Sequence, residues 1–89
     1  MIVKKILFYK NKNIISRQLK LARTKCGLSQ EALAAKMQTM NVNIDQQMIS
    51  KIENNARIVT DYELACFCKI LKISEKDLLH DFYKNYSQE

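Results

Sequence analysis

The sequence contains no proline, no tryptophan and a single glycine. Proline and glycine are typical of the turns that connect short strands, so their scarcity argues against a β-sandwich or a β-barrel and favours helices. A chain of 89 residues with 47% hydrophobic residues suits one small domain with one modest core. We therefore expect a compact all-α fold.

Metal ligands are equally scarce. The chain has one histidine, His80, and three cysteines, Cys26, Cys66 and Cys68. Cys66 and Cys68 are two positions apart on a predicted helix, so their side chains point in different directions. This set offers no tetrahedral metal site, and we expect reduced, partly buried thiols and no metal or cofactor.

Motifs for catalysis are missing too. The sequence has no glycine-rich phosphate loop and no Ser/His/Asp or Cys/His arrangement, so an enzyme is not expected. The apolar run at the N-terminus is interrupted by Lys4 and Lys5 and is too short to cross a membrane. We expect a cytoplasmic, nucleoid-associated protein. Its net charge of +6 and pI near 9.3 favour a polyanionic partner, although they do not specify a fold.

Residues 1–12 form a hydrophobic arm in this interpretation, ahead of a domain over residues 13–82 and a tail over 83–89. The arm is rich in β-branched and aromatic residues and is compatible with a short strand, followed by a turn at 10–13. It could mediate contact with a protein partner or a second copy, or it could fold back on its own core. The sequence favours neither alternative.

The first predicted helix covers residues 14–25. Its apolar residues have the spacing of one helical face: Ile15, Leu19, Ala22 and Cys26. Asn13 is the expected N-cap, and Gly27 is the expected residue after the C-cap because glycine accepts a positive φ.

Four further helix starts share one pattern, in which a polar cap residue lies between two apolar residues that pack together. The caps are Ser29, Asp45, Thr60 and Ser74, and the apolar pairs are Leu28 with Leu33, Ile44 with Ile49, Val59 with Leu64 and Ile73 with Leu78. Thr60 with Glu63 also matches a capping box. The pattern predicts helices over about 30–40, 45–54, 61–72 and 75–82.

The predicted helix over 45–54 has a polar outer face. Ile49 and Ile52 point inward, whereas the outward residues are Gln46, Gln47, Ser50, Lys51 and Asn54. Amide, hydroxyl and ammonium groups can all bond to the edges of bases, so this face is a candidate for reading DNA.

Several segments together resemble the Cro/CI-type helix-turn-helix, the XRE-like and lambda-repressor-like family. They are Arg23, residues 27–31 (GLSQE), Leu33 with Ala34, residues 49–54 (ISKIEN) and residues 71–79. The resemblance covers about residues 14–80. It implies a five-helix domain whose third helix enters the major groove of double-stranded DNA. It also implies a transcriptional regulator, which we expect to be a repressor. We infer a homodimer on an inverted repeat, because one recognition helix covers only a few base pairs. The dimer surface could be the fifth helix with the C-terminal tail, or the N-terminal arm.

The resemblance assigns roles to individual residues. The expected base contacts are Gln46, Gln47, Ser50 and Lys51. The expected phosphate contacts are Ser29, Gln30, Asn54, Asn55 and Arg57. Arg23 and Glu53 are expected to form a buried ion pair that ties the first helix to the third.

The sequence differs from the usual pattern of this family in one place. Residues 38–43 make the connection between the second and third helices about five residues longer than usual, and we expect the second helix to reach about residue 40, with Asn41 in the left-handed turn.

Some domains with this fold have lost DNA binding and act as antitoxin-like or protein-interaction modules. The polar and basic face of the third helix favours DNA instead.

Overall fold

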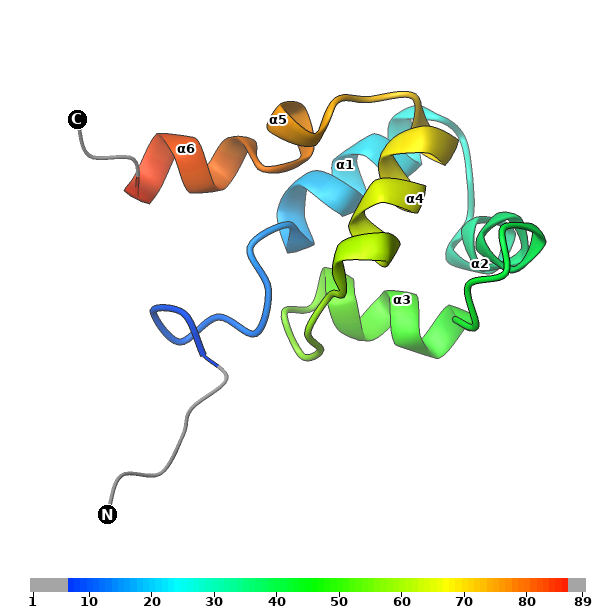
Figure 1. Ribbon diagram of the computed structural model, residues 1–89, viewed down its shortest axis with the longest axis horizontal. Coiled ribbons are helices and arrows are strands. Elements are labelled where there is room, and N and C mark those ends of the chain that lie inside the picture. Colours follow the sequence, from blue (N-terminus) through cyan, green and yellow to red (C-terminus); the bar gives the residue numbers. More distant parts are fainter. Residues whose placement is uncertain (1–6, 87–89) are drawn as a thin grey trace, which may run out of the picture.

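The computed structural model describes residues 7–86, which form six helices around one core (Figure 1). The helices are α1 (Ser16–Lys25), α2 (Gln30–Thr39), α3 (Gln46–Glu53), α4 (Asp61–Leu71), α5 (Glu75–Leu78) and α6 (His80–Tyr86). Within residues 7–86 the only β-type pairing is an isolated bridge between Phe8 and Asn11. The predicted all-α fold is confirmed. No helix in this part of the chain is long and apolar enough to span a membrane.

The four predicted caps begin α2, α3, α4 and α5. Each cap side chain accepts a hydrogen bond from the backbone N–H three residues later: Ser29 from Ala32, Asp45 from Met48, Thr60 from Glu63 and Ser74 from Asp77. Thr60 and Glu63 form the full capping box. All eight apolar residues that flank these caps belong to the core or pack against it. Capping and burial therefore fix the same helix starts.

The core lies where α1, α2, α3 and α4 meet. Leu19, Leu33, Ile52 and Phe67, one from each of these helices, have no exposed surface. In Figure 1 α2 is seen end-on beside the N-terminal end of α3, and α4 passes in front of α1. This packing leaves one long side of α3 at the surface of the molecule.

The long connection between α2 and α3 begins with a Schellman motif, as the sequence predicts for Asn41. This residue has a φ of 65°, its N–H donates to Gln38 O at 3.0 Å, and the N–H of Val42 donates to Met37 O at 3.1 Å. Val42 and Ile44 are buried. The extra residues therefore add to the core instead of forming a loose loop.

The prediction that Asn13 caps the first helix is wrong. Helix α1 begins two residues later, after Ile15, and has no side-chain cap. Asn13 is buried, and its Nδ2 donates to the backbone oxygens of Ile52 at 3.0 Å and Arg57 at 2.9 Å. Its Oδ1 accepts from the N–H of Ile15. Asn13 thus joins the arm to the end of α3, a partner too distant in the sequence to be read from local spacing.

The C-terminal region also differs from the prediction. A helix was expected to end near residue 82, but α6 continues to Tyr86 after a break at Leu79. Two contacts hold α6 in place. Arg17 on α1 donates to Asp81 with 3.0 and 2.8 Å bonds, and aromatic rings from the arm pack on Tyr86.

The arm turns over residues 8–11, with Tyr9 and Lys10 at its centre, two residues earlier than the predicted turn at 10–13. Both residues have positive φ, 49° and 68°, and two backbone hydrogen bonds between Phe8 and Asn11 close the turn. The rings of Phe8 and Tyr9 lie 5.1 and 4.9 Å from the ring of Tyr86. From Leu7 onward the arm therefore folds back on its own domain, whereas residues 1–6, where the strand was considered, lie outside the described part.

An ion pair fixes the loop between α3 and α4. Arg57 donates to both oxygens of Glu63 at 2.9 Å, and the side chain of Glu63 is only 4% exposed. Burial raises the pKa of Glu63, but the hydrogen bonds from Arg57 and from the backbone of Thr60 outweigh it, so the pKa lies below its ordinary value. The charged form of Glu63 is therefore favoured by folding.

This pair makes stability depend on pH. Because the folded pKa of Glu63 is the lower one, its contribution is present above the unfolded value of about 4.3 and is lost as the pH falls through the folded value. We expect Glu63→Gln to lower the free energy of unfolding by about 3 kcal/mol at pH 7. The difference from the wild type should shrink below about pH 4. Urea unfolding at a series of pH values measures both effects. The exposed Glu31→Gln is the control, and a difference that stayed constant with pH would contradict the assignment.

Candidate nucleic-acid interface

The outer side of α3 carries the predicted base-reading residues. Gln46, Gln47 and Lys51 are exposed and Ser50 is partly exposed. On the opposite side Ile49 and Ile52 have no exposed surface. Because residues three and four apart share a helix face, burying the isoleucines forces the polar residues outward. The structure thus brings the four predicted base contacts onto one accessible face.

Arg23 and Glu53 meet beneath this face. Arg23 Nε and Nη2 donate to the two carboxylate oxygens of Glu53 at 2.6 and 3.1 Å. The two side chains are only 10% and 2% exposed. Arg23 Nη1 also donates to the backbone oxygen of Leu28 at 2.7 Å. One guanidinium therefore ties α1 to the last residue of α3 and to the segment that enters α2.

Gln30 extends this ion pair toward the surface. Its Nε2 donates to Glu53 Oε1 at 2.9 Å, and its Oε1 accepts from Gln46 Nε2 at 2.6 Å. A side-chain amide has two N–H groups and a carbonyl oxygen, so Gln46 keeps one donor and one acceptor beyond this bond. That pair of groups matches the N7 and N6 edge of adenine. Gln46 is therefore oriented from below by a continuous polar network.

Ser29 and the first turn of α2 form a second feature beside α3. The hydroxyl of Ser29 accepts from the N–H of Ala32 at 2.9 Å, and Ser29 is exposed. The first N–H groups of a helix have no partners within the helix and carry partial positive charge, which suits a phosphate. Gln30, the first residue of α2, accepts a hydrogen bond from Gln46 and so links this helix start to α3.

Among the predicted phosphate contacts, Asn55 and Arg57 have, like Gln30, side-chain partners inside the protein. Asn55 Oδ1 accepts from the N–H groups of Lys12 at 2.9 Å and Asn13 at 3.1 Å, and its Nδ2 donates to Asn11 Oδ1 at 2.7 Å. Arg57 is bonded to Glu63, as described above. The side chains of both residues thus fasten the loop after α3. Asn54, the remaining contact predicted here, is exposed.

Two asparagines, Asn11 in the arm and Asn13 just after it, contact the end of α3, which the sequence did not predict. Asn11 and Asn13 lie more than forty residues before Asn55, yet all three meet at the C-terminal end of α3. Asn55 has a φ of 59° and follows the C-cap of α3, a position that asparagine accepts better than most residues. A left-handed turn at Asn55 is the only feature that the local sequence could have indicated. The hydrogen bonds of Asn55 with Asn11 and Asn13 join distant parts of the chain, so no local pattern predicts them.

A family model described as helix-turn-helix matches residues 19–78, most of the chain. The chain belongs to the Cro/CI-type helix-turn-helix family. The resemblance inferred from the sequence is thereby confirmed, and membership of this family implies binding to DNA. A comparison with curated proteins found no match.

The ion pair makes a direct prediction about stability. We expect Glu53→Ala to lower the free energy of unfolding by about 3–5 kcal/mol, since Arg23 would remain buried without its partner. Thermal melts or urea unfolding would measure this loss. Glu53→Gln, which keeps acceptor and donor groups of similar size, should lose less than the alanine variant. The exposed Glu31→Ala is the control, and a melting temperature of Glu53→Ala equal to that of the control would rule out the pair as a structural tie.

Proposed function

We propose that this helix-turn-helix protein is a sequence-specific transcriptional repressor that reads the major groove of double-stranded DNA with α3, at the nucleoid of the cytoplasm. The observation that carries the proposal is the network from Arg23 through Glu53 and Gln30 to Gln46. It holds an exposed amide in a defined orientation on a helix whose other side is fully buried. Such preorganisation is what a base-reading side chain requires.

Base reading in this proposal follows from the donors and acceptors on α3. Gln46 and Gln47 bond to the N6 and N7 edge of adenine, and Lys51 donates to O6 or N7 of guanine. Ser50 lies on the same face and can contact a base or a phosphate. Each good bidentate contact discriminates against the wrong base by about 1–3 kcal/mol.

Phosphate contacts would hold α3 in its register. Ser29, Gln30 and the first N–H groups of α2 are proposed to clamp one phosphate, and Asn54 contacts the backbone beyond the other end of α3. We assign Asn55 and Arg57 to holding this second loop in shape, because their side chains already have partners within the domain.

The active form is proposed to be a homodimer on an inverted repeat. One recognition helix covers only a few base pairs, and two half-sites supply the affinity and specificity that a single domain lacks. The two-fold symmetry of the protein would then match that of the operator.

A protein-interaction role is the second candidate, and the arm supplies its observation. Tyr9 is 70% exposed and Tyr83 is 47% exposed, on the arm and on α6. Exposed aromatic groups of this kind are enriched where proteins meet, so an antitoxin-like contact through this surface would be compatible with DNA binding by α3. The absence of acidic and large apolar groups from the exposed side of α3 favours DNA as the ligand of that helix.

Selection of bound sequences from a random DNA pool tests the base contacts. We expect Gln46→Ala and Gln47→Ala each to relax the preference at one or two positions of the half-site, because each loses a discrimination of about 1–3 kcal/mol. Gln18→Ala, on α1 and bonded to Asp81, is the control and should recover the wild-type sequences. If both α3 variants recovered the wild-type sequences as well, α3 would not be the reading helix.

A further inference from the structure

The charges of this chain are divided unevenly along the sequence. Residues 1–30 contain eight lysines and arginines and no aspartate or glutamate, whereas residues 31–89 contain seven basic and nine acidic residues. The first third of the chain therefore carries a net charge of +8 and the remainder one of −2. Such asymmetry suggests a segment that contacts a polyanion. None of the contacts with DNA proposed above uses one of these eight basic residues.

Three exposed lysines of this segment lie at the end of the domain where α3 ends. The two arginines of the segment are bound to carboxylates on other helices. Among residues 7–86, no ion pair involves Lys10, Lys12 or Lys20, and all three are exposed. Lys25, the fourth described lysine of the segment, is at the other end of α1. Lys10, Lys12 and Lys20 are called the basic rim below.

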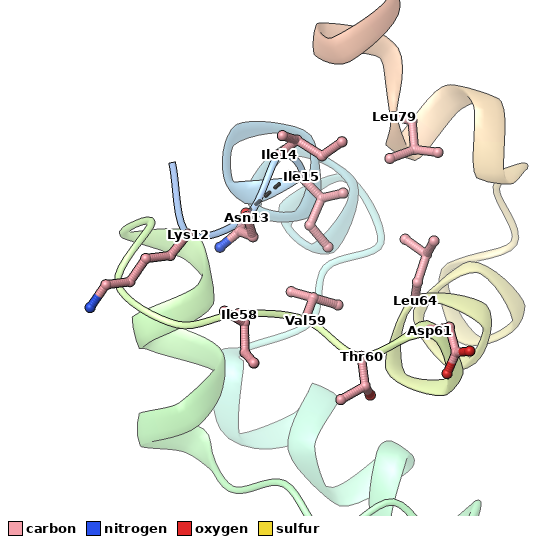
Figure 2. Close-up of a pocket in the computed structure, with 10 residues that line it drawn as sticks. All are labelled: Lys12, Asn13, Ile14, Ile15, Ile58, Val59, Thr60, Asp61, Leu64 and Leu79. Atoms are coloured by element: carbon pink, nitrogen blue, oxygen red, sulfur yellow. Dashed lines mark hydrogen bonds between the residues drawn. The ribbon is translucent and has the colours of Figure 1, made fainter. Parts of the chain in front are cut away.

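The arm holds two lysines of the basic rim next to the C-terminal end of α3. The N–H of Lys12 donates to Asn55 Oδ1 at 2.9 Å, and the turn that contains Lys10 is closed by two backbone bonds of 2.8 Å between Phe8 and Asn11. In Figure 1 this turn lies beyond the C-terminal end of α3. Figure 2 shows the side chain of Lys12 pointing away from the aliphatic residues of the neighbouring groove. The backbone positions of both lysines are thus fixed by the fold.

The third lysine of the basic rim lies on a side of α1 that borders the same end of α3. Lys20 lines a surface hollow of about 300 Å³ together with Ser16, Thr24 and Glu53, the last residue of α3. The carboxylate of Glu53 is bound by Arg23 and its side chain is only 2% exposed, so it does not neutralise this surface. Lys20 therefore continues the positive charge of the arm along α1.

We propose that the basic rim binds a stretch of the DNA phosphate backbone beyond the bases that α3 reads. The eight residues of α3 span about 12 Å, whereas one turn of B-DNA spans about 34 Å. Backbone that passes the C-terminal end of α3 is therefore out of reach of that helix and meets the arm and α1. The inference rests on the proposed binding to DNA, to which it adds a second backbone surface besides the start of α2.

The basic rim supplies a contribution that the other proposed contacts lack. Affinity for DNA comes largely from lysines and arginines that neutralise phosphates and release counterions. The phosphate contacts proposed above, Ser29, Gln30 and Asn54, are all uncharged. An ammonium group binds a phosphate as a point charge and requires no particular base. The three lysines would therefore raise the affinity for every DNA sequence and leave the choice of sequence to α3.

The dependence of DNA affinity on salt tests the proposal. The probe is a duplex with the sequence recovered by the wild type, over about 50 to about 200 mM salt. Each lysine that binds a phosphate adds about 0.9 to the slope of log affinity against log salt concentration. The triple variant Lys10→Gln/Lys12→Gln/Lys20→Gln should therefore lower this slope by about 3, and each single variant by about 1. The loss of affinity in the triple variant should shrink about 40-fold across this range of salt.

A second triple variant separates the basic rim from net charge. Lys69→Gln/Lys72→Gln/Lys76→Gln removes the same charge from three exposed lysines at the end of α4 and on α5, away from α3 in Figure 1. It should change the slope by less than about 1. Sequence selection from a random pool is the second readout. The variant of the basic rim should recover the wild-type sequences, because phosphate contacts carry no sequence information.

The outcomes separate this inference from the proposed function. A slope loss no larger than that of the control, or recovered sequences that differ from those of the wild type, overturns the basic rim as a backbone-binding site. An acidic protein as its partner would give the unchanged slope. If the wild type recovered no preferred sequence, the proposed base reading would fail. The slopes on a random-sequence duplex would then decide: a loss of about 3 in the variant supports the inference, and an unchanged slope or no binding by the wild type overturns it.

Discussion

The ion pair between Arg23 and Glu53 is the interaction on which the exposed side of α3 depends. It joins α1 to the last residue of α3, and the same guanidinium binds the backbone oxygen of Leu28 just before α2. Two almost fully buried charges are stabilising only when every donor and acceptor is satisfied, and Gln30 provides the further bond that Glu53 needs. The satisfaction of a buried carboxylate thus fixes the orientation of Gln46 at the surface. Structure and proposed recognition share one network.

The C-terminal end of α3 is held by a different device. The N–H of Asn13 donates to Asn55 Oδ1, and Asn13 Nδ2 donates to the backbone oxygen of Ile52. Asn55 Nδ2 in turn donates to Asn11 Oδ1, which connects this end of α3 to the turn of the arm. The arm is therefore part of the frame that positions α3, and the aromatic contacts of the turn with Tyr86 extend the frame to α6.

Local chemistry explains how much of this fold the sequence predicts. The caps at Ser29, Asp45, Thr60 and Ser74 each place a side-chain acceptor before an apolar repeat, so the starts of four helices follow from short-range rules. The predicted N-cap role of Asn13 is wrong because the side chain that can cap a helix can also bind backbone groups elsewhere. Asn13 is buried, and its side chain binds the backbone oxygen of Ile52 instead. Helix α6 was cut short in the prediction because its support comes from Arg17 and from the arm, both distant in sequence. The face of α3 was predictable from periodicity, whereas the internal partners of Asn55 and Arg57 were not.

Side-chain amide NMR of the protein with and without its selected DNA tests the central claim most directly. Signals of the Gln46 and Gln47 amide groups should shift on binding, because their N–H groups that face water would donate to base atoms instead. The amides of Gln18 and Gln38, bonded to Asp81 and to the backbone oxygen of Ile44, should keep their positions. The opposite pattern, with Gln46 and Gln47 unchanged while signals on another face move, would show that this domain binds DNA without using α3 as its reading helix.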